Sequence, residues 1–217
     1  LGMKILKSKL IQTIILSKEI KYYFIKPKSN KFLHKNVPYY YQWESEELVD
    51  DFIEGRLEVG DDPKWKNSGA KNKLEYLHWS WSGCGIACFQ MIYSSLTGEK
   101  IPLVNLGKSM MKYGGFKLDK VAYKNGDYLH SLDGLYHKPF LNFLDHEFHL
   151  KGKIISPIVL GEIIQELSLG NFIMASVSSD ISKPEKNNFK KGGHLILILG
   201  YNLDKKILYF HDPSGIY

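Results

Sequence analysis

Apolar side chains recur every three or four positions through much of the first two thirds of the chain. After Gly83 this spacing runs from Ile86 to Leu96 and stops at Thr97-Gly98. It predicts a helix that carries Cys84 in its first turn. With Ser45 and Ser156 as N-caps, the same spacing predicts further helices at 45–54, 103–112, 139–148 and 156–169.

The period changes in the last third of the chain. Residues 172–178, 194–201 and 207–211 are continuous or alternating apolar runs typical of strands, and the turn at 202–204 makes the last two a hairpin. Asp212-Pro213-Ser214-Gly215 follows as a second turn. Because helices come first and strands last, we expect an α+β fold with an N-terminal helical part packed on a C-terminal antiparallel sheet.

The N-terminus follows neither pattern clearly. Residues 11–24 are rich in β-branched and aromatic side chains around a polar break, which predicts one or two strands, arranged as a hairpin. We therefore expect residues 1–36 to be an N-terminal extension and residues 37–217 to be the main domain. Two polar stretches, 60–73 and 180–191, are loops by composition, and 116–137 has only a weak pattern.

Composition and charge narrow the class of protein. The 217 residues are 44% hydrophobic and 24% charged, as in ordinary globular proteins. The net charge of +6 comes almost entirely from lysine, and Arg56 is the only arginine. Arginine is the preferred side chain for bidentate contacts with phosphates and bases, so we do not expect a nucleic-acid partner.

The two cysteines, Cys84 and Cys88, lie one helical turn apart and cannot form a disulfide framework or, alone, a structural zinc site. We expect no cofactor and no metal. No run of about 18 apolar residues exists, so no membrane span is expected. The short stretch 10–16 is a poor signal peptide, which favours the cytoplasm. The sequence does not define the oligomeric state.

A reactive centre is suggested by three residues that lie far apart in the sequence: Cys84, His194 and Asp212. The dipole at a helix N-terminus favours the thiolate, although a free cysteine is usually only packed. Antiparallel pairing of the C-terminal hairpin places His194, at the start of one strand, beside Asp212, at the end of the next. A base oriented by a carboxylate is what a nucleophilic thiol requires. The Cys84 backbone N–H and the Gln42 amide could together stabilise an oxyanion.

Four motifs in this order carry a family resemblance: Val37-Pro38-Tyr39-Tyr40-Tyr41-Gln42, Gly83-Cys84-Gly85-Ile86-Ala87-Cys88, Gly192-Gly193-His194 and Asp212-Pro213-Ser214-Gly215. Together they resemble the papain-like cysteine peptidases, specifically the bacteriocin-processing, double-glycine-leader family (cysteine-peptidase family thirty-nine) and its stand-alone bacterial relatives. The resemblance covers about residues 37–215 and implies a papain-like fold over 37–217.

The resemblance also implies a role for each residue. Cys84 would be the nucleophile, His194 the base and acid, Asp212 the group that orients His194, and Gln42 part of the oxyanion hole. In leader-processing members the glutamine lies only a few residues before the cysteine, whereas Gln42 lies far upstream. His78, six residues before Cys84, and Trp81 are therefore alternative lining groups.

The implied activity is hydrolysis of a peptide or amide bond in a peptide or protein substrate through a thioester. Two alternatives stay open: an acyltransferase of the transglutaminase type at the same site, and a catalytically inactive peptide-binding module. His146 and His149 lack the spacing of zinc peptidases, so a polar helix face or cleft lining is the simpler interpretation. For the four tryptophans, core packing is the default and a substrate groove the alternative.

Overall fold

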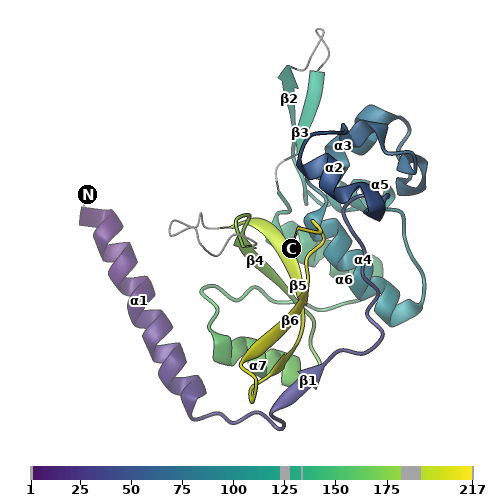
Figure 1. The fold of residues 1–217 in the computed structure, drawn as a ribbon. Helices are drawn as coiled ribbons and strands as arrows, with labels where there is room; N and C mark the ends of the chain where they lie inside the picture. The colour runs from purple at the N-terminus through teal and green to yellow at the C-terminus, as the bar shows by residue number, and fades with distance from the viewer. Residues whose placement is uncertain (1, 123–127, 133, 182–191, 217) are drawn as a thin grey trace. The chain divides into compact units, whose positions relative to one another are not determined.

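The computed structural model describes residues 2–122, 128–132, 134–181 and 192–216 (Figure 1). The predicted α+β class is confirmed, since helices make up most of the first two thirds of the chain and strands of an antiparallel sheet make up most of its last part. In that sheet β5 (Gly193–Asn202) pairs with β1 (Lys31–Leu33), β4 (Ile173–Ser178) and β6 (Ile207–His211). The chain forms two compact units, and β4, β5 and β6 each contribute residues to both.

The first unit contains residues 1–35, 154–173 and 198–210. Its helices are α1 (Gly2–Tyr23) and α7 (Leu160–Ser168), and its strands are β1 with the adjoining parts of β5 and β6. Strand β1 pairs antiparallel with the end of β5, with Phe32 opposite Tyr201. It passes so close to Gly200 that any Cβ atom there would meet the Phe32 carbonyl oxygen.

The strands predicted within residues 11–24 are wrong, because this segment belongs to helix α1. Its partly buried side chains include Ile14, Lys18 and Tyr22, which are spaced four apart and therefore share one helical face. Lys18 Nζ donates to Glu162 Oε2 of α7 at 3.0 Å. Packing against α7 thus outweighs the β propensity of the isoleucines. The boundary predicted after residue 36 stays a prediction.

The second unit contains residues 36–153, 174–197 and 211–217. Besides parts of β4, β5 and β6, its elements are η1 (Glu46–Leu48), α2 (Val49–Ile53), η2 (Val59–Asp61), η3 (Trp65–Ser68), α3 (Lys73–Trp81), α4 (Cys84–Thr97), α5 (Leu103–Lys112), β2 (Leu118–Ala122), β3 (Tyr128–Leu132) and α6 (His137–Phe148).

Helix α4 is the centre of the second unit, and every residue from Gly85 to Ile92 is buried. Phe89 packs on Phe143 and Phe148, with ring centroids 5.1 to 6.0 Å apart. On another side the Cys88 thiol lies 3.5 Å from the Leu195 carbonyl oxygen of β5. The predicted packing of this helix against the sheet is confirmed by that contact.

Several sequence-based elements differ from the structure. Ser45 stands at the N-cap of η1, but its side chain makes no capping hydrogen bond, because its hydroxyl donates to Asp62 instead. Helix α7 begins at Leu160 rather than at Pro157, and the Val159 N–H bonds the Glu162 carboxylate of its first turn. Helix α3 was not predicted, although Asn72 caps it by accepting from the Glu75 N–H at 2.8 Å. The hairpin of β2 and β3 was also missed. The predicted loop at 180–191 lies almost entirely outside the described residues.

Candidate active site

Cys84 is the first residue of α4, and Gly83 is its N-cap. The helix forms here because the apolar spacing after Cys84 buries one side chain after another. The Cys84 side chain is partly exposed, whereas Cys88 is fully buried. Burial raises the pKa of the Cys88 thiol well above its usual range, as do the nearby Cys84 and Asp212 charges. Of the two thiols, Cys84 alone has both solvent access and the helix N-terminus.

His194 and Asp212 lie side by side, as the hairpin geometry predicts. His194 is the second residue of β5, and Asp212 directly follows β6. His194 Nε2 lies 2.6 Å from Asp212 Oδ1, and both side chains are largely buried. With Nε2 on the carboxylate, Nδ1 is the ring nitrogen left for another partner. Cys84 lies close enough for its interaction with His194 to raise the pKa of the imidazole. The imidazole therefore interacts with both the thiol and the carboxylate.

The charges of this group favour an imidazolium. Burial alone would lower the pKa of His194, but hydrogen bonds to Asp212 and Cys84 outweigh it and raise the pKa of His194 to about 9. Burial opposes the ionised form of Asp212 as well, yet its bonds with His194 and Ser214 lower its pKa. At neutral pH a protonated His194 therefore faces an ionised Asp212.

Ser214 is a further residue of this group that sequence reasoning did not single out. Its backbone N–H and its hydroxyl both donate to Asp212 Oδ1, at 2.9 and 2.6 Å. These bonds hold the carboxylate in one orientation toward His194. The Asp-x-Ser spacing is a known turn signature and could have predicted the backbone bond.

Gln42 is fixed beside the Cys84 turn. Its backbone N–H donates to the Pro213 carbonyl oxygen at 2.8 Å. The indole N–H of the next residue, Trp43, donates to the Ser214 carbonyl oxygen at 3.0 Å. A Cβ atom on Gly83 would lie 3.3 Å from Gln42 Cβ, so the glutamine packs directly against the N-cap of α4.

Within the described part of the chain, the buried Gln42 Oε1 has no hydrogen-bond partner. This oxygen is an acceptor, and buried acceptors without a partner are few in folded proteins.

The other lining groups proposed from sequence lie on α3. His78 is partly buried, and Trp81, the last residue of the helix, is 55% exposed. The Trp81 ring packs edge-on against Trp43 with centroids 5.0 Å apart. Trp43 and Trp79 are buried, and Trp65 packs against the same core as Trp43. These three tryptophans therefore pack in the core, as expected. Trp81 instead exposes an aromatic surface close in sequence to Cys84.

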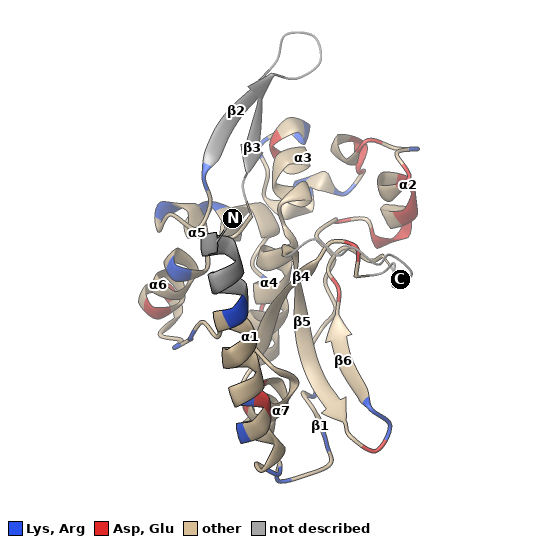
Figure 2. Ribbon diagram, turned by 90° about the vertical axis from the view of Figure 1, so that its left-hand side faces the viewer, with Lys and Arg blue, Asp and Glu red and all other residues tan. Residues whose placement is uncertain are grey.

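Charged side chains are distributed over many elements. Lysines occur on α1, α5, α6 and the turn after β5, whereas acidic side chains gather on η1 and α2 (Figure 2). Among the residues described, no helix is both long and apolar enough to cross a bilayer.

Comparisons with known proteins add a family to this geometry. A model of the Peptidase_C39 like family matches residues 34–216, which include all four sequence motifs and every side chain of the group around Cys84. No curated protein matches the chain, and no solved structure does. The family match covers most of the chain and supports a peptidase. The protein therefore belongs to the Peptidase_C39 like family, and its α+β fold is of the papain-like type.

Proposed function

We propose that the protein is a cysteine peptidase in which Cys84 is the nucleophile, His194 the base and acid, and Asp212 the group that orients His194. One observation carries this proposal: His194 hydrogen-bonds Asp212 at 2.6 Å, and interactions with both Asp212 and Cys84 raise the pKa of its imidazole. A thiol, an imidazole that serves as its base and a carboxylate that orients the imidazole are the groups that thiolate chemistry at neutral pH uses.

Cys84 gives its proton to His194 before the substrate arrives, which forms a thiolate–imidazolium pair. The thiolate attacks the peptide carbonyl carbon, and the carbonyl oxygen becomes an oxyanion. The Cys84 backbone N–H and the Gln42 amide N–H stabilise that oxyanion. His194 then gives its proton to the leaving amine as the C–N bond breaks, which leaves a thioester. A water molecule gives a proton to His194 and attacks the thioester carbon. The C–S bond then breaks, the acid leaves, and the thiolate–imidazolium pair is restored.

Support for Gln42 as the second donor comes from its position. It packs against Gly83, and its backbone is tied to the turn after Asp212. His78 lies on α3, within the helix that leads to Gly83. A Gln42→Ala variant should lose roughly 100-fold or more in kcat, the usual cost of removing one oxyanion donor. A larger loss in His78→Ala than in Gln42→Ala would reverse the assignment.

The two cysteines provide a matched test of the proposal. We expect iodoacetamide to modify Cys84 faster than an ordinary exposed thiol at pH 6, because the neighbouring imidazolium and the helix N-terminus stabilise a thiolate. Cys84→Ala should abolish cleavage of a pool of synthetic peptides, and Cys88→Ala should preserve it. Full cleavage by Cys84→Ala would refute the mechanism, and alkylation of Cys84 at the rate of an ordinary thiol would favour an inactive peptide-binding module.

The same acyl-enzyme could pass its acyl group to an amine. Peptide cleavage in the presence of excess methylamine separates the two outcomes by mass spectrometry. We expect the free acid as the main product. A predominant methylamide would instead identify an acyltransferase.

A further inference from the structure

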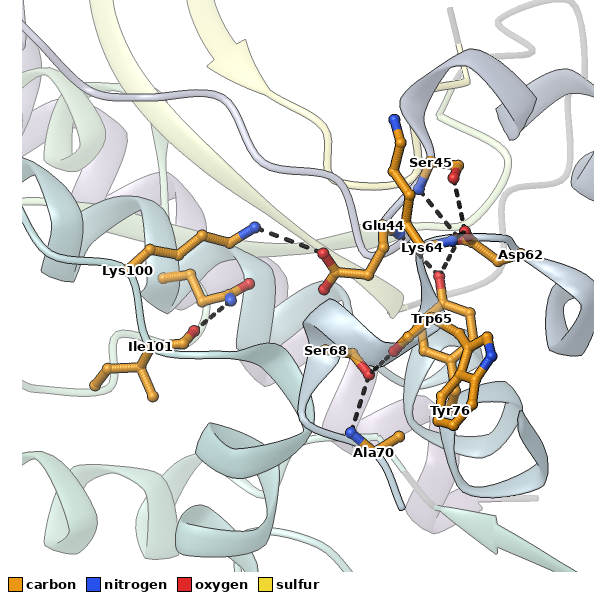
Figure 3. Close-up of polar contacts among 11 residues, drawn as sticks. Glu44, Ser45, Asp62, Lys64, Trp65, Ser68, Ala70, Tyr76, Lys100 and Ile101 are labelled. Atoms are coloured by element: carbon orange, nitrogen blue, oxygen red, sulfur yellow. Dashed lines mark hydrogen bonds and ion pairs between the residues drawn. The ribbon is translucent and has the colours of Figure 1, made fainter. Parts of the chain in front are cut away.

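The segment between Gln42 and Cys84 contains a buried polar network, shown in Figure 3. Its centre is Asp62, which has no exposed surface. The carboxylate accepts from the Ser45 hydroxyl at 2.6 Å, from the Ser45 N–H at 3.1 Å and from the Lys64 N–H at 2.8 Å. The Tyr76 hydroxyl adds a fourth donor at 2.5 Å. We call Ser45, Asp62 and Tyr76 the clamp.

The clamp binds the main chain directly after Gln42. While the Tyr76 hydroxyl donates to Asp62, it accepts from the Glu44 N–H at 2.8 Å. Burial and the bond to Asp62 raise the pKa of Tyr76 far above its usual value, so the phenol keeps its proton. Both backbone N–H groups at 44 and 45 are thus held by buried side chains, which fixes two consecutive residues of the segment that carries Gln42.

Tyr76 connects this segment to the turn before Cys84. It lies on α3, and its carbonyl oxygen accepts the Ser80 hydroxyl at 2.8 Å. The Ser80 carbonyl oxygen in turn accepts the N–H of Gly83, the N-cap of the helix that begins with Cys84. The clamp therefore fastens the Gln42 segment to the helix that leads to Cys84.

The segment that carries Gln42 is also held by the turn after Asp212. The backbone N–H of Gln42 and the indole N–H of Trp43 both donate to carbonyl oxygens of that turn. Gln42 thus lies between two anchors, one on the Asp212 turn and one on α3. The side-chain oxygen of Gln42 makes no hydrogen bond within the described residues. This oxygen therefore does not help to position the glutamine. The two anchors supply this restraint through the main chain.

We propose that Asp62 and Tyr76 are positioning residues that hold the Gln42 amide beside Gly83 and Cys84 for oxyanion binding. This inference rests on the proposed function. A network in which each member is satisfied is rigid, and oxyanion donors lose their effect when displaced by about 1 Å. Neither residue belongs to the thiol–imidazole–carboxylate group, and neither contacts the reacting atoms.

Two small reagents separate oxyanion binding from thiol reactivity. When p-nitrophenyl acetate reacts with Cys84, the thiolate adds to the acetyl carbonyl, an oxyanion forms, and p-nitrophenolate leaves behind an acetyl thioester. Iodoacetamide instead alkylates the thiolate with loss of iodide, and no oxyanion forms. The ratio of the acylation rate to the alkylation rate therefore reports on the oxyanion hole, independently of how reactive Cys84 is.

We expect Tyr76→Phe to lower this ratio by roughly tenfold, and Gln42→Ala by more, following the usual effect of an oxyanion donor. The Gln42→Ala/Tyr76→Phe double variant should fall no further than Gln42→Ala, because the clamp acts through Gln42. Ser68→Ala is the matched control, since Ser68 is buried in the same segment but, within the described residues, its hydroxyl bonds Trp65 and Ala70 rather than the clamp (Figure 3). It should leave the ratio unchanged.

Circular dichroism and thermal melting establish that each variant is folded. Should Tyr76→Phe fail to fold, Ser45→Ala decides the question, because it removes one bond to Asp62 and should lower the ratio by roughly two- to fivefold. A folded Tyr76→Phe with an unchanged ratio overturns the inference, as does a ratio lowered equally by Ser68→Ala. If the wild-type protein shows no acylation above the Cys84→Ala background, the proposed function fails instead.

Discussion

Replacing Asp212 tests how strongly the carboxylate holds the His194 imidazolium. In the wild type the pKa of His194 rises from 6.5 to about 9, against the effect of burial. At about 1.4 kcal/mol per pKa unit, this shift corresponds to roughly 3 kcal/mol, and Asp212 and Cys84 share it. Because the imidazole keeps some contact with solvent, screening by water makes this figure an upper limit.

Two substitutions divide the effect of Asp212 into charge and orientation. Asp212→Asn keeps a side-chain oxygen that can accept from His194 Nε2 and from Ser214, but it removes the negative charge. We expect the His194 pKa to fall by about one unit in this variant, and kcat by roughly tenfold. Asp212→Ala removes the hydrogen bond as well, so its His194 pKa should approach the ordinary value and its kcat should fall by roughly 100-fold or more.

The pH dependence of stability gives an independent readout. A histidine whose folded pKa exceeds its unfolded pKa stabilises the protein fully below about pH 6.5, and this contribution disappears as pH rises through about 9. The difference in unfolding free energy between wild type and Asp212→Ala should therefore shrink between pH 6 and pH 10. Asp212 also contributes to stability, but that contribution is lost only at acidic pH, because the folded pKa of Asp212 is lowered.

The assay is an NMR titration of the imidazole C–H signals, with His194 identified by its loss in His194→Ala. Urea denaturation at pH 6 and pH 10 supplies the free energies. An unchanged His194 pKa in Asp212→Ala would refute the reasoning, since the 2.6 Å contact would then have no electrostatic consequence.

Four further substitutions have distinct expected outcomes. Cys88→Ala should keep its activity and lose about 1 kcal/mol of stability in thermal melts, because it removes a fully buried side-chain atom. Ser214→Ala removes the 2.6 Å hydroxyl bond to Asp212, and should lower kcat several-fold at unchanged KM in steady-state assays. Gly83→Ala places a Cβ 2.9 Å from a backbone oxygen of α3, and should cost roughly 1–3 kcal/mol in urea denaturation. Trp81→Ala removes a side chain that is 55% exposed, so peptide KM should rise while the melting temperature changes little; an unchanged KM would exclude a substrate contact.

Local pattern identified much of the candidate site. The helix at Cys84 was predictable because its apolar spacing is regular and its ends are marked by glycines at 83 and 98. The contact between His194 and Asp212 was predictable because antiparallel pairing across a short turn brings these two strand ends together. Both features depend on residues that are close together in the sequence, so they can be predicted from its pattern.

Other features depend on partners far along the chain. Helix α1 contains many strand-favouring residues, and its contacts with α7, such as the one between Lys18 and Glu162, stabilise the helical form. Ser45 looks like a helix cap in sequence, yet its hydroxyl is drawn to Asp62, 17 residues later. Residues outside the predicted site, such as Tyr76, could not be recognised because no local rule relates a helical tyrosine to the backbone N–H of Glu44.

By itself the sequence determined the α+β class, the helix that begins at Cys84 and the order of the four motifs. Periodicity and turn chemistry are local properties, and they carry this information without a tertiary partner. Only the tertiary structure decided that Cys84 and Asp212 share one imidazole, that Gln42 packs against Gly83, and that a buried clamp forms within residues 43–79. Those contacts join residues separated by 14 to more than 100 positions, and their geometry exists only once the core has closed.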